Sequence, residues 1–122
     1  MRRELELTLL EIMSELSRID EATREIDEAE WLRRHGELDT ILRALHRLSR
    51  CLRSLPYEFT SARPEVPWTR LASLGPELEG AEFRMDPRAV WRAIREDLPV
   101  LKREILGVVD ELKYRRASEE EE

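Results

Sequence analysis

The segment LELTLLEIMSELSRIDEATREI, residues 5–26, decides the fold of this 122-residue chain. Its regularly spaced positions advance by alternating steps of four and three, which places them in one stripe along a helix. The stripe consists of Leu5, Leu9, Ile12, Leu16, Ile19, Thr23 and Ile26. Arg33, Arg34 and His35 precede Gly36, a pattern typical of a last helical turn and its left-handed cap. We therefore predict a first helix from about Arg3 to Trp31.

A second stripe begins directly after Gly36. Its members are Leu38, Ile41, Leu45, Leu48, Leu52 and Leu55. Pro56 follows at once and has no backbone N–H with which to continue a helix. This pattern predicts a second helix from about Glu37 to Leu55. Cys51 is the single cysteine, so it has no disulfide partner within the chain, and its leucine neighbours favour a small buried hydrophobe over a reactive thiol.

Prolines organise the middle of the chain. The stretch PYEFTSARPEVPW, residues 56–68, holds three of the six prolines and predicts a connection without a helix. Pro67 suits the first position of a short third helix, Trp68 to Leu74, because a first helical amide needs no intrahelical acceptor. The next stretch, LGPELEGAEF, residues 74–83, places two glycines and a proline within six residues and raises the question of what it replaces.

The last helix is predicted by its start signal and its stripe. Asp86 and Pro87 form an N-cap and first-position pair. The apolar positions that follow are Val90, Trp91, Ile94, Leu98, Leu101, Ile105, Val109 and Leu112. Pro99 is expected to bend this helix locally. The acidic residues 118–122 have nothing to bury, and we expect them to be a disordered tail.

These stripes predict an all-α fold, an antiparallel up-and-down helical bundle in one domain, residues 1–117. It would contain two long helices, a short helix and a long proline-bent C-terminal helix. A first helix about 40 Å long exceeds what two shorter helices can cover, so we expect a homodimer, with fraying of the helix end as the alternative. Trp31, Trp68 and Trp91 are expected to be core or interface anchors.

Composition and charge limit the classes of partner. The net charge of −6 argues against general nucleic-acid binding through bulk electrostatics. No apolar run approaches the roughly 18 residues of a membrane span, and MRRELELTLLEI at the N-terminus does not look like a secretory signal. The expected location is the cytoplasm, without a membrane partner. Nearly all cations are arginines, which suit both phosphate binding and ion pairs on helix surfaces.

No motif in the sequence predicts a known catalytic or metal centre. His35 and His46 lie on different predicted helices, and no paired-histidine, cysteine-pair or phosphate-loop motif occurs. We therefore expect no metal and no cofactor. Glu77, Glu79 and Glu82 are clustered and could bind a metal or a partner's arginines, although a polar loop explains them as well.

Two stretches of the second half resemble a known family. They are PEVPWTRLASLG, residues 64–75, and MDPRAVWRAIREDLPVLKREI, residues 85–105, and they resemble HepT-like proteins of the HEPN superfamily. The matching residues are Pro64, Val66, Pro67, Trp68, Asp86, Val90, Trp91, Asp97, Leu98, Pro99 and Leu101. The first half is compatible with the family but generic. The resemblance implies an all-helical dimer, and many members are ribonuclease toxins paired with a minimal nucleotidyltransferase antitoxin.

The resemblance also implies where the chemistry should lie. The family motif is an arginine, a polar residue, a histidine four positions later, and a tyrosine two further on that the antitoxin can adenylylate. In this sequence the corresponding residues are Gly75, Pro76, Gly80 and Glu82. Glycine cannot hold a phosphate or move a proton through a side chain, and glutamate offers no hydroxyl. Gly75 and Pro76 should also break the helix that carries the motif, so the family site is predicted to be lost.

Three functions are compatible with this sequence. The leading hypothesis is a catalytically silent HepT-like subunit, a dimeric interaction protein that docks a nucleotidyltransferase-type partner through helix faces and the loop 75–86. The second is a diverged ribonuclease toxin that uses Arg70, Arg84 or His46. The third is a noncatalytic RNA or nucleotide binder.

The third hypothesis rests on the arginines of the second predicted helix. Arg43, Arg47 and Arg50 are spaced by four and three residues and therefore share a helix face. Such a face could bind phosphates, and it could equally form surface ion pairs.

Overall fold

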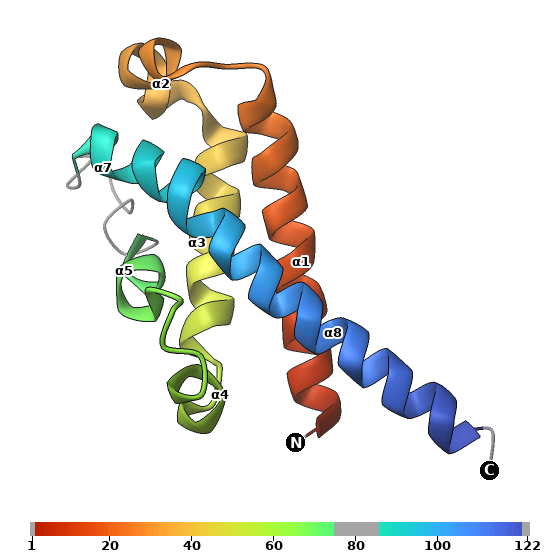
Figure 1. Ribbon diagram of the computed structural model, residues 1–122. Helices are drawn as coiled ribbons and strands as arrows, with labels where there is room; N and C mark the ends of the chain where they lie inside the picture. Colours follow the sequence, from red (N-terminus) through yellow and green to blue (C-terminus); the bar gives the residue numbers. More distant parts are fainter. Residues whose placement is uncertain (1, 75–85, 121–122) are drawn as a thin grey trace.

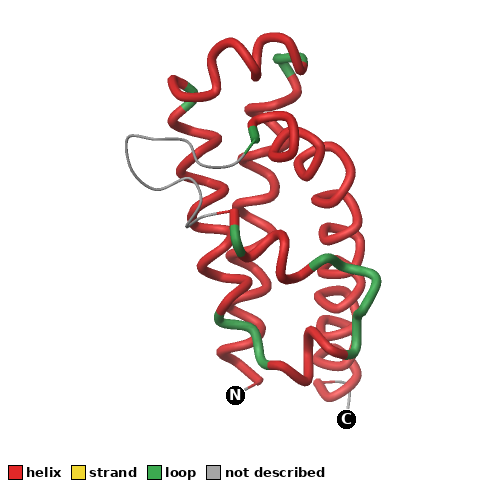
Figure 2. The backbone as a smooth tube through the Cα atoms, turned by 90° about the vertical axis from the view of Figure 1, so that its left-hand side faces the viewer, coloured by secondary structure: helices red, strands yellow, loops and turns green. Residues whose placement is uncertain are grey.

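The computed structural model describes residues 2–74 and 86–120, and within these ranges it contains helices and no strand. Three long helices form the body: α1 (Arg2–Arg24), α3 (Asp39–Arg53) and α8 (Leu98–Glu120). α1 and α3 run antiparallel side by side, and α8 crosses them diagonally (Figures 1 and 2). The predicted all-α helical bundle is confirmed.

Shorter elements close the bundle around this body. They are α2 (Glu28–Arg34), the 3₁₀ turn η1 (His35–Glu37), α4 (Tyr57–Ser61), α5 (Trp68–Ala72) and α7 (Pro87–Arg92). α5 packs on α3, and α2 packs on α7. The expected stripes converge in one core, in which Leu9, Ile12, Leu45, Leu48, Leu101 and Ile105 are fully buried. The same spacing that predicted the helices therefore also selected the residues that pack together.

The first predicted helix is too long, because α1 ends at Arg24. Asp27 adopts an extended conformation, and its carboxylate accepts a hydrogen bond from the Glu30 N–H at 2.8 Å, which starts α2 as a separate helix. At the end of α1, the Arg95 guanidinium donates to the carbonyls of Thr23 at 3.2 Å and Ile26 at 3.3 Å. The length argument for a dimer therefore weakens, because the chain turns back at Asp27.

The turn at Asp27 carries Trp31 into the core. Its indole is fully buried and stacks on Trp91, with ring centroids 5.9 Å apart and an interplanar angle of 26°. Its Nε1 donates to the Pro87 carbonyl at 2.8 Å, and the Arg95 guanidinium lies 4.5 Å from the centroid of the Trp91 ring. These contacts confirm Trp31 and Trp91 as core anchors and join α2 to the start of the last helical segment.

The proline-rich connection holds a helix that was not predicted. Pro56 caps α4, and Phe59 from this helix is buried. Trp68 packs edge-on against Phe59 at 6.1 Å and donates from Nε1 to the Arg63 carbonyl at 2.9 Å. Pro67 stands at the N-cap of α5 rather than at its first position. A five-residue helix with one buried aromatic leaves no periodic signal in the sequence, so it reads as a loop.

The last helical segment is locally distorted before Pro99, where a bend was expected, and it ends later than predicted. Asp86 caps α7 as predicted, accepting from the Arg88 N–H at 3.0 Å. Between α7 and α8 lies the π-helical turn η2 (Ala93–Asp97), in which the Leu98 N–H bonds to the Ala93 carbonyl. This wider turn lies just before Pro99, whose ring would clash with a carbonyl in a regular helix. α8 continues to Glu120, so residues 118–120 are helical where a disordered tail was expected.

Candidate functional site

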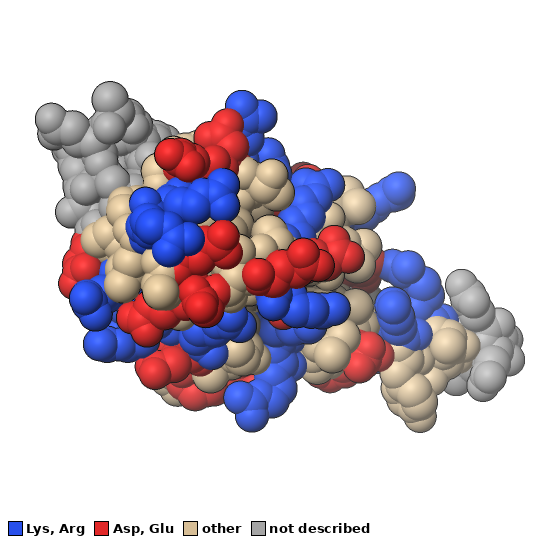
Figure 3. All heavy atoms as spheres, turned by 90° about the horizontal axis from the view of Figure 1, so that it is seen from above, with Lys and Arg blue, Asp and Glu red and all other residues tan. Residues whose placement is uncertain are grey.

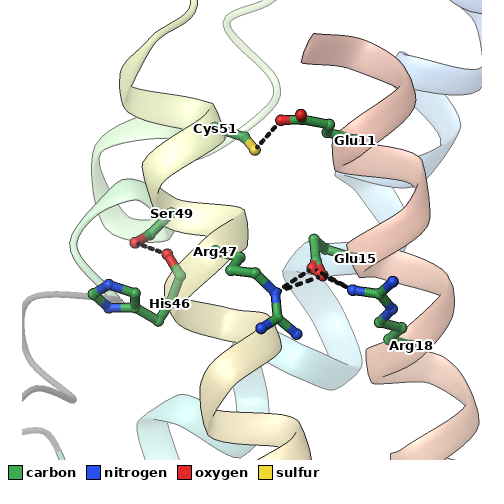
Figure 4. A network of polar contacts seen from close by, with 7 residues as sticks. All are labelled: Glu11, Glu15, Arg18, His46, Arg47, Ser49 and Cys51. Carbon is green, nitrogen blue, oxygen red and sulfur yellow. Dashed lines mark hydrogen bonds and ion pairs between the residues drawn. The ribbon is translucent and has the colours of Figure 1, made fainter. Parts of the chain in front are cut away.

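A groove with a volume of about 500 Å³ lies between α1 and α3. Charged side chains from both helices line it, namely Glu11, Glu15, Arg18, Arg47 and Arg50, together with Cys51. In Figure 4 the side chains of Glu11 and Glu15 from α1 point toward those of Cys51 and Arg47 from α3. Among the described residues, this groove therefore combines concavity with several convergent ionic groups.

Glu15 is the anchor of the groove. Only 5% of its side chain is exposed, so its carboxylate must be paired to remain ionised. Arg47 donates to it from Nε at 2.9 and 3.0 Å, and Arg18 donates from Nη1 at 2.8 Å (Figure 4). One buried carboxylate therefore holds two guanidinium groups from two different helices.

The structure separates the arginines that the sequence placed on one face. Arg47 and Arg50 line the groove, whereas Arg43 pairs with Asp39 at 3.4 Å on the exposed side of α3. The imidazole of His46 lies on the other side of α3 from Arg47 (Figure 4). Arg18 was not predicted as part of this group; the available signal was its position three residues after Glu15 on a helix. The groove therefore unites Arg18, Arg47 and Arg50 and leaves His46 out.

Arg70 was proposed as a replacement for the family arginine, and its guanidinium is already engaged. It forms a two-bond pair with Asp97, from Nε to Oδ2 and from Nη2 to Oδ1, both at 2.9 Å. The hydrogen bond and charge of Asp97 raise the pKa of Arg70 above its usual range. This pairing occupies the Nε and Nη2 edge of the guanidinium, so Arg70 connects α5 to η2.

The residues at the family motif positions lie outside the described residues. These are Gly75, Pro76, Gly80 and Glu82, and the same holds for Arg84, Glu77 and Glu79. The loss of the family site therefore stays a prediction from the sequence. Within residues 2–74 and 86–120, no three His, Cys, Asp or Glu side chains gather in a metal-binding group. None of the helices described there combines the length and the apolar character that crossing a membrane requires.

Cys51 is only half-buried, which corrects the expectation of a buried hydrophobe. Its thiol donates to the Glu11 carboxylate at 3.4 Å, and burial, followed by this hydrogen bond and charge, raises the pKa of Cys51 to about 11. At pH 8 the thiolate form of Cys51 is therefore about 100-fold rarer than that of a thiol with a pKa of 9.0. The higher nucleophilicity of a thiolate with a higher pKa offsets part of this difference.

We therefore expect alkylation of Cys51 by iodoacetamide at pH 8 to be about tenfold slower than that of a model thiol. The pH dependence of the alkylation rate should give a pKa near 11. Glu11→Gln should lower that pKa, because it removes the carboxylate charge beside the thiol. A wild-type pKa below 9 would contradict the hydrogen bond to Glu11.

Comparisons with known proteins show which family and which individual proteins the chain resembles. The model of a family described as "Ribonuclease HepT-like" matches residues 12–108. The chain is 31% identical over 102 residues to the "Probable ribonuclease HepT" of Thermococcus cleftensis, covering 84% of this chain and 93% of that protein. It is 26% identical over 104 residues to a "Putative RNase" of Methanocaldococcus jannaschii, covering 85% of this chain and 95% of that protein.

One of the similar proteins is considerably longer. The "Gamma-glutamylcyclotransferase and putative RNase" of Methanocaldococcus jannaschii is 27% identical over 112 residues, which are 92% of this chain and 50% of that protein. The chain therefore spans about half the length of that relative. No solved structure matches this chain.

Proposed function

The chain belongs to the HepT-like ribonuclease family, and from this membership we propose that it is a catalytically silent subunit of that family. In this proposal it forms a homodimer and docks a minimal nucleotidyltransferase-type partner, as in a toxin–antitoxin module. The observation that carries the proposal is the sequence at the motif positions, where Gly75 and Gly80 have no side-chain group for binding phosphate or transferring a proton. Glu82 has no hydroxyl to receive a nucleotide.

The described neighbours do not assemble a substitute site. Arg70 is held by Asp97 through its Nε and Nη2, and His46 lies across α3 from Arg47. Catalysis by a shifted pair would need an arginine and a histidine close to one scissile phosphate. Seen from above, acidic and basic side chains are interspersed over the molecule (Figure 3), so this face offers no broad cationic surface for RNA.

Exposed apolar side chains support the dimeric part of the proposal. Leu7 and Leu10 on α1 are 56% and 50% exposed, and Leu106 on α8 is 42% exposed. Leu7 and Leu10 line the same surface hollow, and neighbouring exposed leucines favour an interface with another protein surface. The mass of the purified chain, measured by light scattering, should be that of a dimer, and Leu10→Glu should shift it toward the monomer. A monomer at all concentrations would remove this part of the proposal.

The catalytic part predicts that the purified chain leaves total RNA intact. The comparison is an Arg70→Ala/His46→Ala variant, with added ribonuclease to show that the RNA can be cut. We expect the wild type and the variant to be indistinguishable. Cleavage by the wild type that disappears in the variant would establish a diverged ribonuclease instead.

The partner is tested separately with a minimal nucleotidyltransferase from the same genome and labelled ATP. We expect the two proteins to co-purify without transfer of label to this chain. Failure to co-purify would remove the partner from the proposal. Labelling of this chain would contradict the prediction that it is not adenylylated.

A further inference from the structure

We propose that the groove between α1 and α3 is a phosphate-binding site, in which Glu15 fixes the guanidinium groups of Arg18 and Arg47 and Arg50 supplies a third cation. The ligand group is a phosphate, which is carried either by a single strand of RNA or by a free nucleotide. This site does not require the chain to cut RNA, so it is independent of the proposed loss of catalysis.

The hydrogen bonds of Glu15 leave most donors of both arginines available. Arg47 uses only its Nε, and Arg18 uses only its Nη1. A guanidinium has five N–H donors, so each still presents both donors of Nη2 and others beyond it. In Figure 4 the two terminal nitrogens of Arg47 point away from Glu15. Within the part of the chain that the structure describes, these terminal nitrogens of Arg47 bond to no protein acceptor.

Burial of Glu15 fixes the position of these donors. The carboxylate is 5% exposed, whereas the Arg47 and Arg18 side chains are 46% and 54% exposed. Each guanidinium therefore has one edge on a buried anchor and the rest in the groove. Arginines held in this way lose less conformational freedom when they bind a ligand than arginines on an open surface.

The local charge favours an anion although the whole chain carries −6. Arg18, Arg47 and Arg50 face Glu11 and Glu15 in the groove, which leaves one net positive charge. Glu15 is covered by its two arginines, and Glu11 accepts a hydrogen bond from Cys51 at the other end. The outward groups are thus mainly cationic, which suits the single negative charge of a phosphodiester.

The size of the groove agrees with this ligand. Its volume of about 500 Å³ lies within the 300–1,000 Å³ that is common for small-ligand sites. A buried ion pair is a weak source of stability, since an apolar pair of the same volume often serves the fold as well. Phosphate binding therefore explains the presence of the Glu15, Arg18 and Arg47 cluster better than a contribution to stability does.

The test measures the fluorescence anisotropy of a labelled ten-nucleotide oligouridine. The purified chain is added to it in increasing amounts, in whichever oligomeric state it adopts. Three phosphate contacts on a single strand predict a slope of about −2 for log affinity against log salt, or about 20-fold weaker binding between 50 and 200 mM KCl. Arg50→Ala should weaken binding about tenfold and reduce the slope by about 0.7. Among the described residues Arg50 has no ion-pair partner, so its removal leaves the fold intact.

Arg43→Ala is the matched control. It lies on the same helix and removes the same charge, but its side chain pairs with Asp39 outside the groove. We expect it to change the affinity less than twofold. Equal losses in Arg43→Ala and Arg50→Ala, or a midpoint that ignores salt, would overturn the proposal.

Competition with AMP and with inorganic phosphate distinguishes the two sources of the phosphate group. Displacement of the oligouridine by micromolar AMP would assign the groove to a free nucleotide. Binding of RNA that millimolar AMP and phosphate leave unchanged would assign it to the RNA backbone. If neither the oligouridine nor AMP binds at 50 mM KCl, the groove is not a phosphate site.

Discussion

Trp31→Ala is expected to lower the free energy of unfolding by about 3–5 kcal/mol, the usual cost of removing a buried tryptophan. The indole is fully buried, stacks on Trp91 and donates to the Pro87 carbonyl. Its removal leaves a cavity between α2 and α7 and an acceptor without this donor. Urea denaturation followed by circular dichroism measures the change.

Two further variants separate the parts of this effect. Trp31→Phe keeps an aromatic ring but lacks the indole N–H, and we expect it to cost about half as much. Trp68→Ala is the matched control, because Trp68 is only partly buried and packs on the small helix α4. A loss below about 1 kcal/mol for Trp31→Ala would mean that α2 does not pack on α7 as described.

The position of Trp31 shows where sequence periodicity stops being informative. The stripe from Leu5 to Ile19 predicted a buried helix face, and this face is buried from Leu9 to Ile19 and partly buried at Leu5. The same spacing continues through Ile26, and for this reason the predicted helix ran past Asp27. Asp27, followed three residues later by Glu30, is a local signal for the start of a helix. In the structure Asp27 starts α2, although the apolar spacing of the first helix continues to Ile26. Periodicity identifies a face, but a side chain that caps the backbone decides where the chain turns.

The groove was only partly predictable for a different reason. The spacing of Arg47 and Arg50 placed them on one face, and they do line the same groove. The residues near Glu15 in the sequence do not predict its ion pair with Arg47, because the two residues are 32 positions apart. The pairing depends on the register of α1 against α3, which is a property of the packed helices. The family motif, in contrast, can be compared in the sequence alone, because it lies within eight consecutive positions, 75–82.

Arg47→Ala is expected to lower the free energy of unfolding by about 2 kcal/mol. Breaking a fully buried ion pair by removing one partner costs about 3–5 kcal/mol, because the other charge is left buried. Here the penalty is smaller, since Arg18 stays bound to Glu15 and the Arg47 side chain is 46% exposed. Urea denaturation at low and high salt measures the loss. Arg43→Ala, which removes a pair exposed on both sides, should change stability by less than about 0.5 kcal/mol.

Glu15→Leu makes the opposite comparison at the same contact. It removes the buried charge itself, so both arginines return to solvent and no ionic group is left uncompensated. We expect its unfolding free energy to lie within about 1 kcal/mol of the wild type, or above it. The same variant should bind oligouridine more weakly, although it raises the net charge, because the guanidinium groups are no longer held over the groove. If Glu15→Leu instead destabilised the chain as much as Arg47→Ala and left binding unchanged, the ion cluster would be a brace between α1 and α3, and the phosphate site would lose its structural basis.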